Sequence, residues 1–69
     1  MGPKYEARQL GSGSNVYVIT KDNGKLVLSR GPAGEPIWED AGARNPDVMN
    51  LVFLKPEAEV IAWALNNIE

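Results

Sequence analysis

The dipeptide Asn23-Gly24 stands between two stretches rich in β-branched and apolar residues, and the whole segment spans residues 16–30. Asn-Gly is typical of a two-residue type I′ turn, because both central positions of that turn need a positive φ. Alternating apolar residues on both sides of such a turn predict a β-hairpin. This hairpin restricts the chain to folds that contain an antiparallel sheet.

The length of the turn determines which residues face each other. With two residues in the loop, Asp22 faces Lys25 and opposite charges meet beside the turn. A three-residue loop would set Lys21 against Lys25, and like charges directly opposite each other destabilise a strand pair. We therefore predict the first register. Its other facing pairs are Thr20 with Val27, Ile19 with Leu28, and Tyr17 with Arg30.

Both faces of the predicted hairpin are partly apolar. Because side chains alternate along a strand, each face receives every second residue. One face carries Tyr17, Ile19, Leu26 and Leu28. The other face carries Val16, Val18, Thr20, Val27 and Ser29. Such a hairpin is either central in its sheet or covered on its second face by another subunit.

Further strands are expected on both sides of the hairpin. Residues 4–10 alternate weakly and precede the flexible connector Gly11-Ser12-Gly13-Ser14, so they predict a first strand. After a turn at residues 31–36, Ile37-Trp38-Glu39 predicts a short edge strand, because the prolines before it cannot donate ladder hydrogen bonds. Residues 40–47 predict an exposed loop.

Residues 48–54 are ambiguous. Asn45-Pro46-Asp47 could cap a short helix, whereas Leu51-Val52-Phe53-Leu54 has the composition of a strand. We predict a strand, because a helix this short, stopped by Pro56, would be poorly supported. In addition, Lys55 stands before a proline and is therefore biased toward extended geometry.

A helix is predicted from Pro56 to about Ile68. Proline suits the first helical position, and Glu57 and Glu59 favour the positive N-terminal end. At about 100° per residue, Trp63 lies almost opposite Ile61, on an outer face. The face expected to cover the sheet holds Glu57, Ala58, Ile61, Ala64, Leu65 and Ile68.

These elements predict an α+β fold in a single domain over residues 1–69. It is a small antiparallel sheet of four to five strands, with one C-terminal helix packed on one face. The run Leu54-Lys55-Pro56-Glu57-Ala58 resembles the strand-to-helix junction of many small uncharacterised phage and bacterial proteins. The resemblance covers only the last quarter of the chain. It implies the same fold class and a phage or mobile-element accessory setting, and it assigns no functional residue.

The composition argues against catalysis and against nucleic acid as a partner. The chain has no cysteine and no histidine, which removes thiolate nucleophiles, imidazole acid-base chemistry and the commonest metal ligands. Glu39 and Asp40 would point to opposite sides of a strand, so they form neither a metal site nor a catalytic pair. The net charge is -2 at pH 7. We expect a protein that is not an enzyme, with no cofactor, no metal and no nucleic acid.

Nothing in the sequence suggests a membrane or secretory segment. No apolar run approaches the ~20 residues that a membrane helix needs, and the first residues lack the apolar core of a secretory signal. We therefore expect a cytoplasmic protein.

Two groups of residues are candidates for a protein interface, either with another protein or in a homo-oligomer. Trp63 and Val60, with Asn67 beside them, form the outer face of the predicted helix, where tryptophan is typical of a binding hot spot. Trp38, Glu39 and Asp40 combine an aromatic ring with carboxylates that could contact a basic surface. In the competing interpretation, Trp63 is a lone exposed tryptophan without a function or folds sideways onto the sheet edge, and Trp38 belongs to the core.

A ligand site is the alternative. Ser12 and Ser14 lie in a loop with exposed amides and hydroxyls, and Arg30 and Arg44 could pair with a phosphate if their loops converge. The first hypothesis is therefore a non-enzymatic protein that acts by stoichiometric protein-protein contact, as a phage-type accessory or counter-defence inhibitor. The second is an oligomeric module that binds or sequesters a small ligand or nucleotide at sites between subunits.

Overall fold

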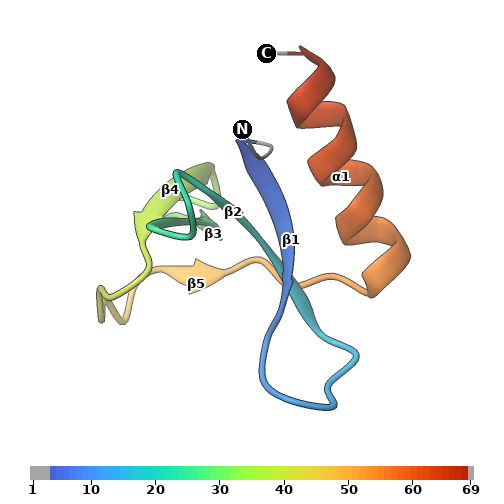
Figure 1. Ribbon diagram of the computed structural model, residues 1–69. Helices are drawn as coiled ribbons and strands as arrows, with labels where there is room; N and C mark the ends of the chain where they lie inside the picture. Colours follow the sequence, from blue (N-terminus) through green and yellow to red (C-terminus); the bar gives the residue numbers. More distant parts are fainter. Residues whose placement is uncertain (1–3, 69) are drawn as a thin grey trace.

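The computed structural model describes residues 4–68 and confirms the α+β fold, in which one helix packs on one face of an antiparallel sheet (Figure 1). Four strands follow each other in both chain and sheet order, and a short β5 pairs with β3. The elements are β1 (Tyr5–Gln9), β2 (Tyr17–Lys21), β3 (Leu26–Arg30), β4 (Pro36–Asp40), β5 (Met49–Asn50) and α1 (Lys55–Ile68).

The turn between β2 and β3 has the predicted positive φ values at its two central residues. Asn23 and Gly24 have φ values of 61° and 86°, and Asp22 before them differs from the prediction with a positive φ of 54°. The N–H of Lys25 donates to the carbonyl of Asp22 at 3.3 Å. Thr20 pairs with Val27, which confirms the two-residue loop.

Beyond the turn, β2 and β3 separate, and residues 49–53 lie between them. The N–H of Leu51 donates to the carbonyl of Leu28 at 3.1 Å. Tyr17 and Phe53 exchange both of their backbone hydrogen bonds, each at 2.8 Å. The inserted segment therefore satisfies the backbone groups that the two strands of an ordinary hairpin would offer to each other.

This insertion corrects two predictions. The pairs Ile19 with Leu28 and Tyr17 with Arg30 do not form, because pairing of β2 with β3 stops after the two positions next to the turn. The strand predicted over residues 48–54 is present only in part. Regular pairing is limited to β5 and an isolated bridge at Phe53, and the segment is not helical.

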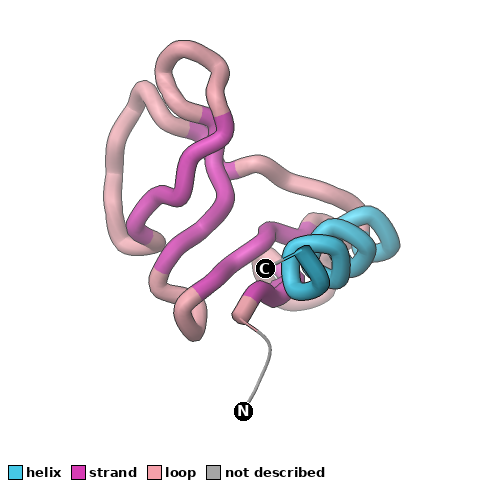
Figure 2. Tube along the Cα trace, turned by 90° about the horizontal axis from the view of Figure 1, so that it is seen from above, coloured by secondary structure: helices cyan, strands magenta, loops and turns pink. Residues whose placement is uncertain are grey.

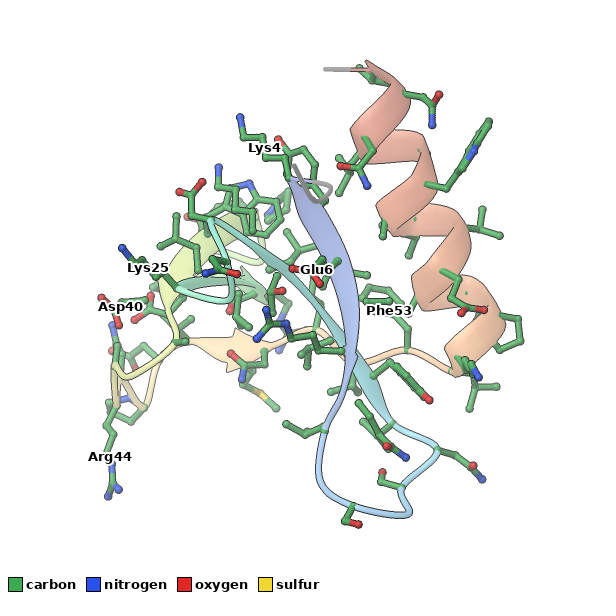
Figure 3. The ribbon with its side chains drawn as sticks, viewed as in Figure 1. Lys4, Glu6, Lys25, Asp40, Arg44 and Phe53 are labelled. Carbon is green, nitrogen blue, oxygen red and sulfur yellow. The ribbon has the colours of Figure 1, made fainter. Side chains whose placement is uncertain are left out.

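The core lies between α1 and one face of the sheet, and Figure 2 shows the helix to one side of the strands. Its centre is Ile19, which is fully buried together with Ala58. In Figure 3, Phe53 lies between β1 and α1. The partly buried residues packed on this centre are Ala7, Tyr17, Leu28, Trp38, Phe53, Ile61 and Leu65.

The opposite face of β2 and β3 is also buried. Val18, Thr20, Val27 and Ser29 are all at most 6% exposed. The hairpin is therefore central in its sheet, which was one of the two expectations for a hairpin with two apolar faces. The hydroxyl of Ser29 lies 3.1 Å from the carbonyl of Val27 and 3.0 Å from Asn50 Oδ1. Thr20 Oγ1, in contrast, has no hydrogen-bond partner among the described residues.

We expect Thr20→Val to raise the free energy of unfolding by about 1 kcal/mol. Valine has nearly the same shape and removes a buried hydroxyl that makes no hydrogen bond. Urea unfolding followed by circular dichroism measures the change. The matched control is Ser29→Ala, which should lower stability by about 1–3 kcal/mol because it leaves the partners of a buried hydroxyl unpaired. Loss of stability in Thr20→Val would mean that its hydroxyl is bonded in solution.

The helix begins with half of a capping box. The N–H of Leu54 donates to Glu57 Oε1 at 3.1 Å, and the N–H of Ala58 donates to the carbonyl of Leu54 at 2.9 Å. The helix starts at Lys55, one residue before the predicted start, and it extends to Ile68 as predicted among the described residues.

The side of α1 that faces the sheet differs from the predicted one. Ala58 is buried, and Ile61 and Leu65 contact the core as expected. Ile68 is 80% exposed and Glu57 is exposed, so the prediction that these two residues face the sheet is wrong.

Ala62 and Asn66 explain this rotation. Ala62 is only 7% exposed, and its small side chain lets the helix lie close to the sheet. The Asn66 amide bonds both backbone groups of Tyr5: the N–H of Tyr5 donates to Oδ1, and Nδ2 donates to the carbonyl, each at 2.9 Å. These contacts turn the helix toward β1 and leave the predicted apolar face half uncovered.

Candidate protein interface

The side of α1 away from the sheet carries a stripe of four apolar residues, three of which are exposed. We call Val60, Trp63, Ala64 and Ile68 the outer stripe. Val60, Trp63 and Ile68 are 64%, 66% and 80% exposed, and Ala64 is half-buried. Residues three and four positions apart are neighbours on a helix surface, so the four side chains form one continuous stripe.

The exposure of Trp63 confirms its predicted place on the outer face. The residue also borders a hollow together with residues of the edge strand β1. Asn67 is exposed too, and its Nδ2 donates to the carbonyl of Trp63 at 2.6 Å. The amide is therefore turned back along the helix, and the indole ring stays accessible.

Shallow hollows flank the outer stripe on both sides. Trp63 and Glu59 line one of about 360 Å³ with Tyr5 and Ala7 of β1. Val60 lines another of about 510 Å³ with Phe53 and Pro56, and most of its walls are apolar. The accessible apolar surface therefore extends beyond the helix itself.

The acidic group predicted around Trp38 does not form one patch. The Trp38 ring is half-buried on the helix side, 5.6 Å from the Tyr5 ring, with Lys21 Nζ 4.6 Å from its centroid. Glu39 follows on the opposite face, because side chains alternate along β4. Asp40 is exposed, and its Oδ1 accepts a hydrogen bond from the N–H of Gly42 at 2.8 Å.

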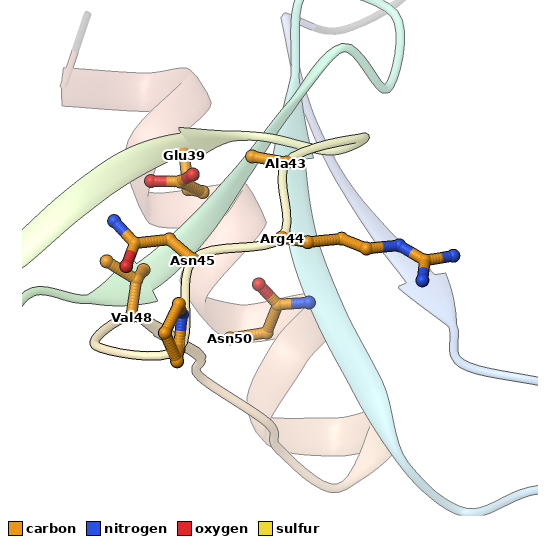
Figure 4. Close-up of a pocket in the computed structure, with 7 residues that line it drawn as sticks. Glu39, Ala43, Arg44, Asn45, Val48 and Asn50 are labelled. Atoms are coloured by element: carbon orange, nitrogen blue, oxygen red, sulfur yellow. The ribbon is translucent and has the colours of Figure 1, made fainter.

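Glu39 lines a hollow of about 400 Å³ between the sheet and the loop after β4. Asn45, Val48 and Asn50 are among its other lining residues (Figure 4). Arg44 belongs to the same loop, but its guanidinium is directed away from the other labelled side chains in Figure 4. Arg44 is also among the residues that line the hollow, which therefore carry one carboxylate, two amides and one guanidinium group.

The residues of the alternative ligand site are not brought together within one copy of the chain. Ser14 supports its own loop, since Oγ accepts a hydrogen bond from the N–H of Val16 at 2.9 Å. The loop that holds Ser12 and Ser14 lies at the bottom of the view, apart from Arg44 at its lower left edge (Figures 1 and 3). Arg30 lines a different hollow from Arg44.

The structure shows no candidate metal site among residues 4–68, because no three carboxylates lie close enough together to hold a metal ion. Among these residues there is also no helix with the length and hydropathy of a membrane span. No protein-family model, curated protein or solved structure matches the chain.

Val60 and Trp63 were predicted on the outer face of the helix, whereas Ala64 and Ile68 were predicted on the face that covers the sheet. The alanine at position 62 and the asparagine at position 66 were the signals that could have corrected the helix phase. These two residues are four positions apart and therefore share one face of the helix.

Proposed function

We propose that this protein acts without catalysis, by binding a partner protein stoichiometrically through the outer stripe of α1. The observation that supports this function is the exposure of Val60, Trp63 and Ile68 on one side of the helix. Contiguous apolar patches on soluble proteins mark interaction sites more often than chance exposure does. Tryptophan is also enriched among the few residues that supply most of the binding energy at interfaces.

The chemistry of the chain supports a binding role. It has neither cysteine nor histidine, and the carboxylates around β4 are divided between the two faces of the strand. The hollow at Glu39 is lined by this carboxylate, two amides and Arg44, and none of its lining residues is a serine, threonine or lysine that could act as a nucleophile.

The biological setting we propose is that of a phage-type accessory protein or counter-defence inhibitor in the cytoplasm. A chain of 69 residues with a net charge of -2 suits a small inhibitor that works by contact. The resemblance of the run Leu54-Lys55-Pro56-Glu57-Ala58 to small phage and bacterial proteins supports the same setting.

We expect Trp63→Ala to weaken binding to the partner by about 2 kcal/mol or more, because truncation removes a central aromatic contact. The fold should be nearly unchanged, since the ring is 66% exposed. The experiment first captures the partner from the cells that make the protein. Titration calorimetry with the purified partner then gives the stoichiometry and the dissociation constant.

The matched control is Leu10→Ala, which removes another exposed apolar side chain in the loop after β1. This variant should bind like the wild type. If Trp63→Ala binds normally while melting like the wild type, the outer stripe is not the binding surface. A saturable rise in melting temperature with a nucleotide or metabolite would instead support the alternative, a ligand-binding module.

A further inference from the structure

We infer that β4 binds an extended segment of a partner protein, which adds one antiparallel strand to the sheet and places a lysine or arginine side chain beside Glu39. We call the side of β4 that faces away from β3 the β4 edge. It lies on a different element from the outer stripe of α1, so the inference goes beyond the proposed function. Its support comes from the backbone groups of β4, from the opposite edge of the sheet and from the carboxylate of Glu39.

The hydrogen bonds beside β4 determine which of its backbone groups face outward. The N–H of Ala41 donates to the carbonyl of Lys25 at 2.9 Å, in the same register as the pairs of β3 with β4. Opposite residues of an antiparallel pair alternate between bonded and non-bonded positions. Pro36, Trp38 and Asp40 therefore hold non-bonded positions with β3 and direct their backbone groups away from it.

Four of these outward groups have no hydrogen-bond partner among residues 4–68. They are the carbonyl of Pro36, the N–H and the carbonyl of Trp38, and the N–H of Asp40. The carbonyl of Asp40 is occupied, because it accepts a hydrogen bond from the N–H of Ala43 at 3.0 Å. A row of donors and acceptors along the edge of a sheet is what an added strand satisfies.

The opposite edge of the sheet, at β1, is already occupied. The N–H of Tyr5 donates to Asn66 Oδ1, and Asn66 Nδ2 donates to the carbonyl of Tyr5, each at 2.9 Å. The helix α1 also packs against β1. A strand added at β1 would have to displace a helix side chain, whereas no side chain of the described chain bonds the outward groups of β4. The β4 edge is therefore the better site for an added strand.

Acidic side chains define the kind of segment that this edge accepts. Residues 31–43 include Glu35, Glu39 and Asp40 but no lysine or arginine. Glu35 and Asp40 each accept a hydrogen bond from a backbone N–H of the adjoining turn. The carboxylate of Glu39 has no hydrogen-bond or ion-pair partner in the described chain, and it lines the hollow of about 400 Å³ (Figure 4). It is available to a basic group from outside.

The basic side chains near β4 leave Glu39 unpaired within residues 4–68. Lys21 lies on the other face of the strand, with Nζ 4.6 Å from the centroid of the Trp38 ring. Lys25 is exposed and forms no ion pair with any described residue. Arg44 lines the same hollow, but its guanidinium is directed away from Glu39 in Figure 4.

An added antiparallel strand brings one of its side chains close to Glu39. Trp38 and Asp40 supply outward hydrogen bonds, so Glu39 between them takes a non-bonded position, where opposite Cα atoms are only about 4.5 Å apart. A lysine or arginine at that position forms a charge-assisted contact with the carboxylate. A second copy of this chain would instead bring its own three carboxylates to the edge, and like charges disfavour that pairing.

NMR titration with two synthetic peptides tests the added strand. The probes are the end-blocked peptides Thr-Val-Lys-Val-Thr and Thr-Val-Glu-Val-Thr. The lysine peptide should shift the amide signals of Trp38 and Asp40 and slow their exchange with solvent, because both N–H groups become hydrogen-bonded. It should also bind roughly fivefold or more tightly than the glutamate peptide, since its charge is opposite to that of Glu39.

Three variants separate the contribution of charge from that of the backbone. Glu39→Lys should reverse the preference and bind the glutamate peptide more tightly. Asp40→Ala and Asp40→Pro both remove the carboxylate, but only proline removes the outward N–H. Asp40→Pro should therefore bind the lysine peptide roughly fivefold more weakly than Asp40→Ala. Proline is tolerated on an edge strand where the N–H is not bonded to the neighbouring strand, and circular dichroism shows whether each variant is folded.

The outcomes that overturn the inference are distinct from those that test the outer stripe. Equal binding of the two peptides by the wild type overturns it, as does the absence of shifts at Trp38 and Asp40 up to about 5 mM peptide. Shifts confined to Trp63 and its neighbours on α1 also overturn it, and they support the proposed function. Protection of the Trp38 and Asp40 amides at high protein concentration without peptide would show that a second copy occupies the edge, which overturns it too. If Asp40→Pro does not fold, the reversed preference of Glu39→Lys decides the question.

Discussion

Replacing Ile19 by alanine is expected to lower the free energy of unfolding by about 2–5 kcal/mol. The Ile19 side chain is fully buried between the sheet and α1, and it touches the two alanines that bring the helix close. Truncation removes apolar contacts and leaves a cavity that these small neighbours cannot fill. A domain of this length has a total stability of only roughly 3–10 kcal/mol, so the substitution should remove a large part of it.

Denaturant unfolding followed by circular dichroism measures this loss. Val52→Ala is the matched control, because Val52 is 53% exposed and its truncation should change stability by less than about 0.5 kcal/mol. Equal effects of the two substitutions would show that Ile19 is not at the centre of the core.

The second large effect is expected for Gly24→Val, which should lower the free energy of unfolding by about 1–3 kcal/mol. Gly24 has a φ of 86°, a conformation that a β-branched residue strongly resists. A Cβ atom at this position would also lie 2.5 Å from Arg8 Nη1, so the end of a flexible side chain must move as well.

Gly34→Val separates these two causes. Gly34 has a nearly equal φ of 87°, but a Cβ atom there meets nothing within 4 Å. The difference between the two valine variants therefore reports the contact with Arg8. Gly24→Asn should cause little backbone strain and therefore a smaller loss of stability than Gly24→Val, since asparagine tolerates the left-handed region. A fully stable Gly24→Val would contradict the type I′ turn.

The sequence by itself determined the features that depend on neighbouring residues. The Asn23-Gly24 turn, its two-residue loop and the pairing of Thr20 with Val27 follow from local φ preferences and from the charges beside the turn. The C-terminal helix follows from Pro56 in its first turn and from the apolar residues after it. The outward position of Trp63 could also be predicted, because the residue lies on the side of the helix away from Ile61 and Leu65 in both orientations.

The tertiary structure alone decided how these elements meet. Residues 49–53 insert between β2 and β3, so the backbone partners of Tyr17 and Leu28 come from a segment more than 20 residues away in the chain. The alternation of apolar and polar residues within the hairpin does not indicate that a distant segment will pair with its strands. The predicted strand pairs were therefore correct only next to the turn, where the loop holds the strands together.

The phase of α1 was decided in the same way. A count of apolar residues places Ile68 in the core, whereas the structure buries Ala62 and leaves Ile68 80% exposed. Close approach of two backbones favours small side chains, and the Asn66 bonds to Tyr5 hold the helix in that orientation. Hydrophobicity along one helix cannot reveal these contacts, because they depend on a strand 61 positions away in the sequence. The sequence therefore determined which residues of α1 are apolar, and packing against β1 determined which of them remain exposed.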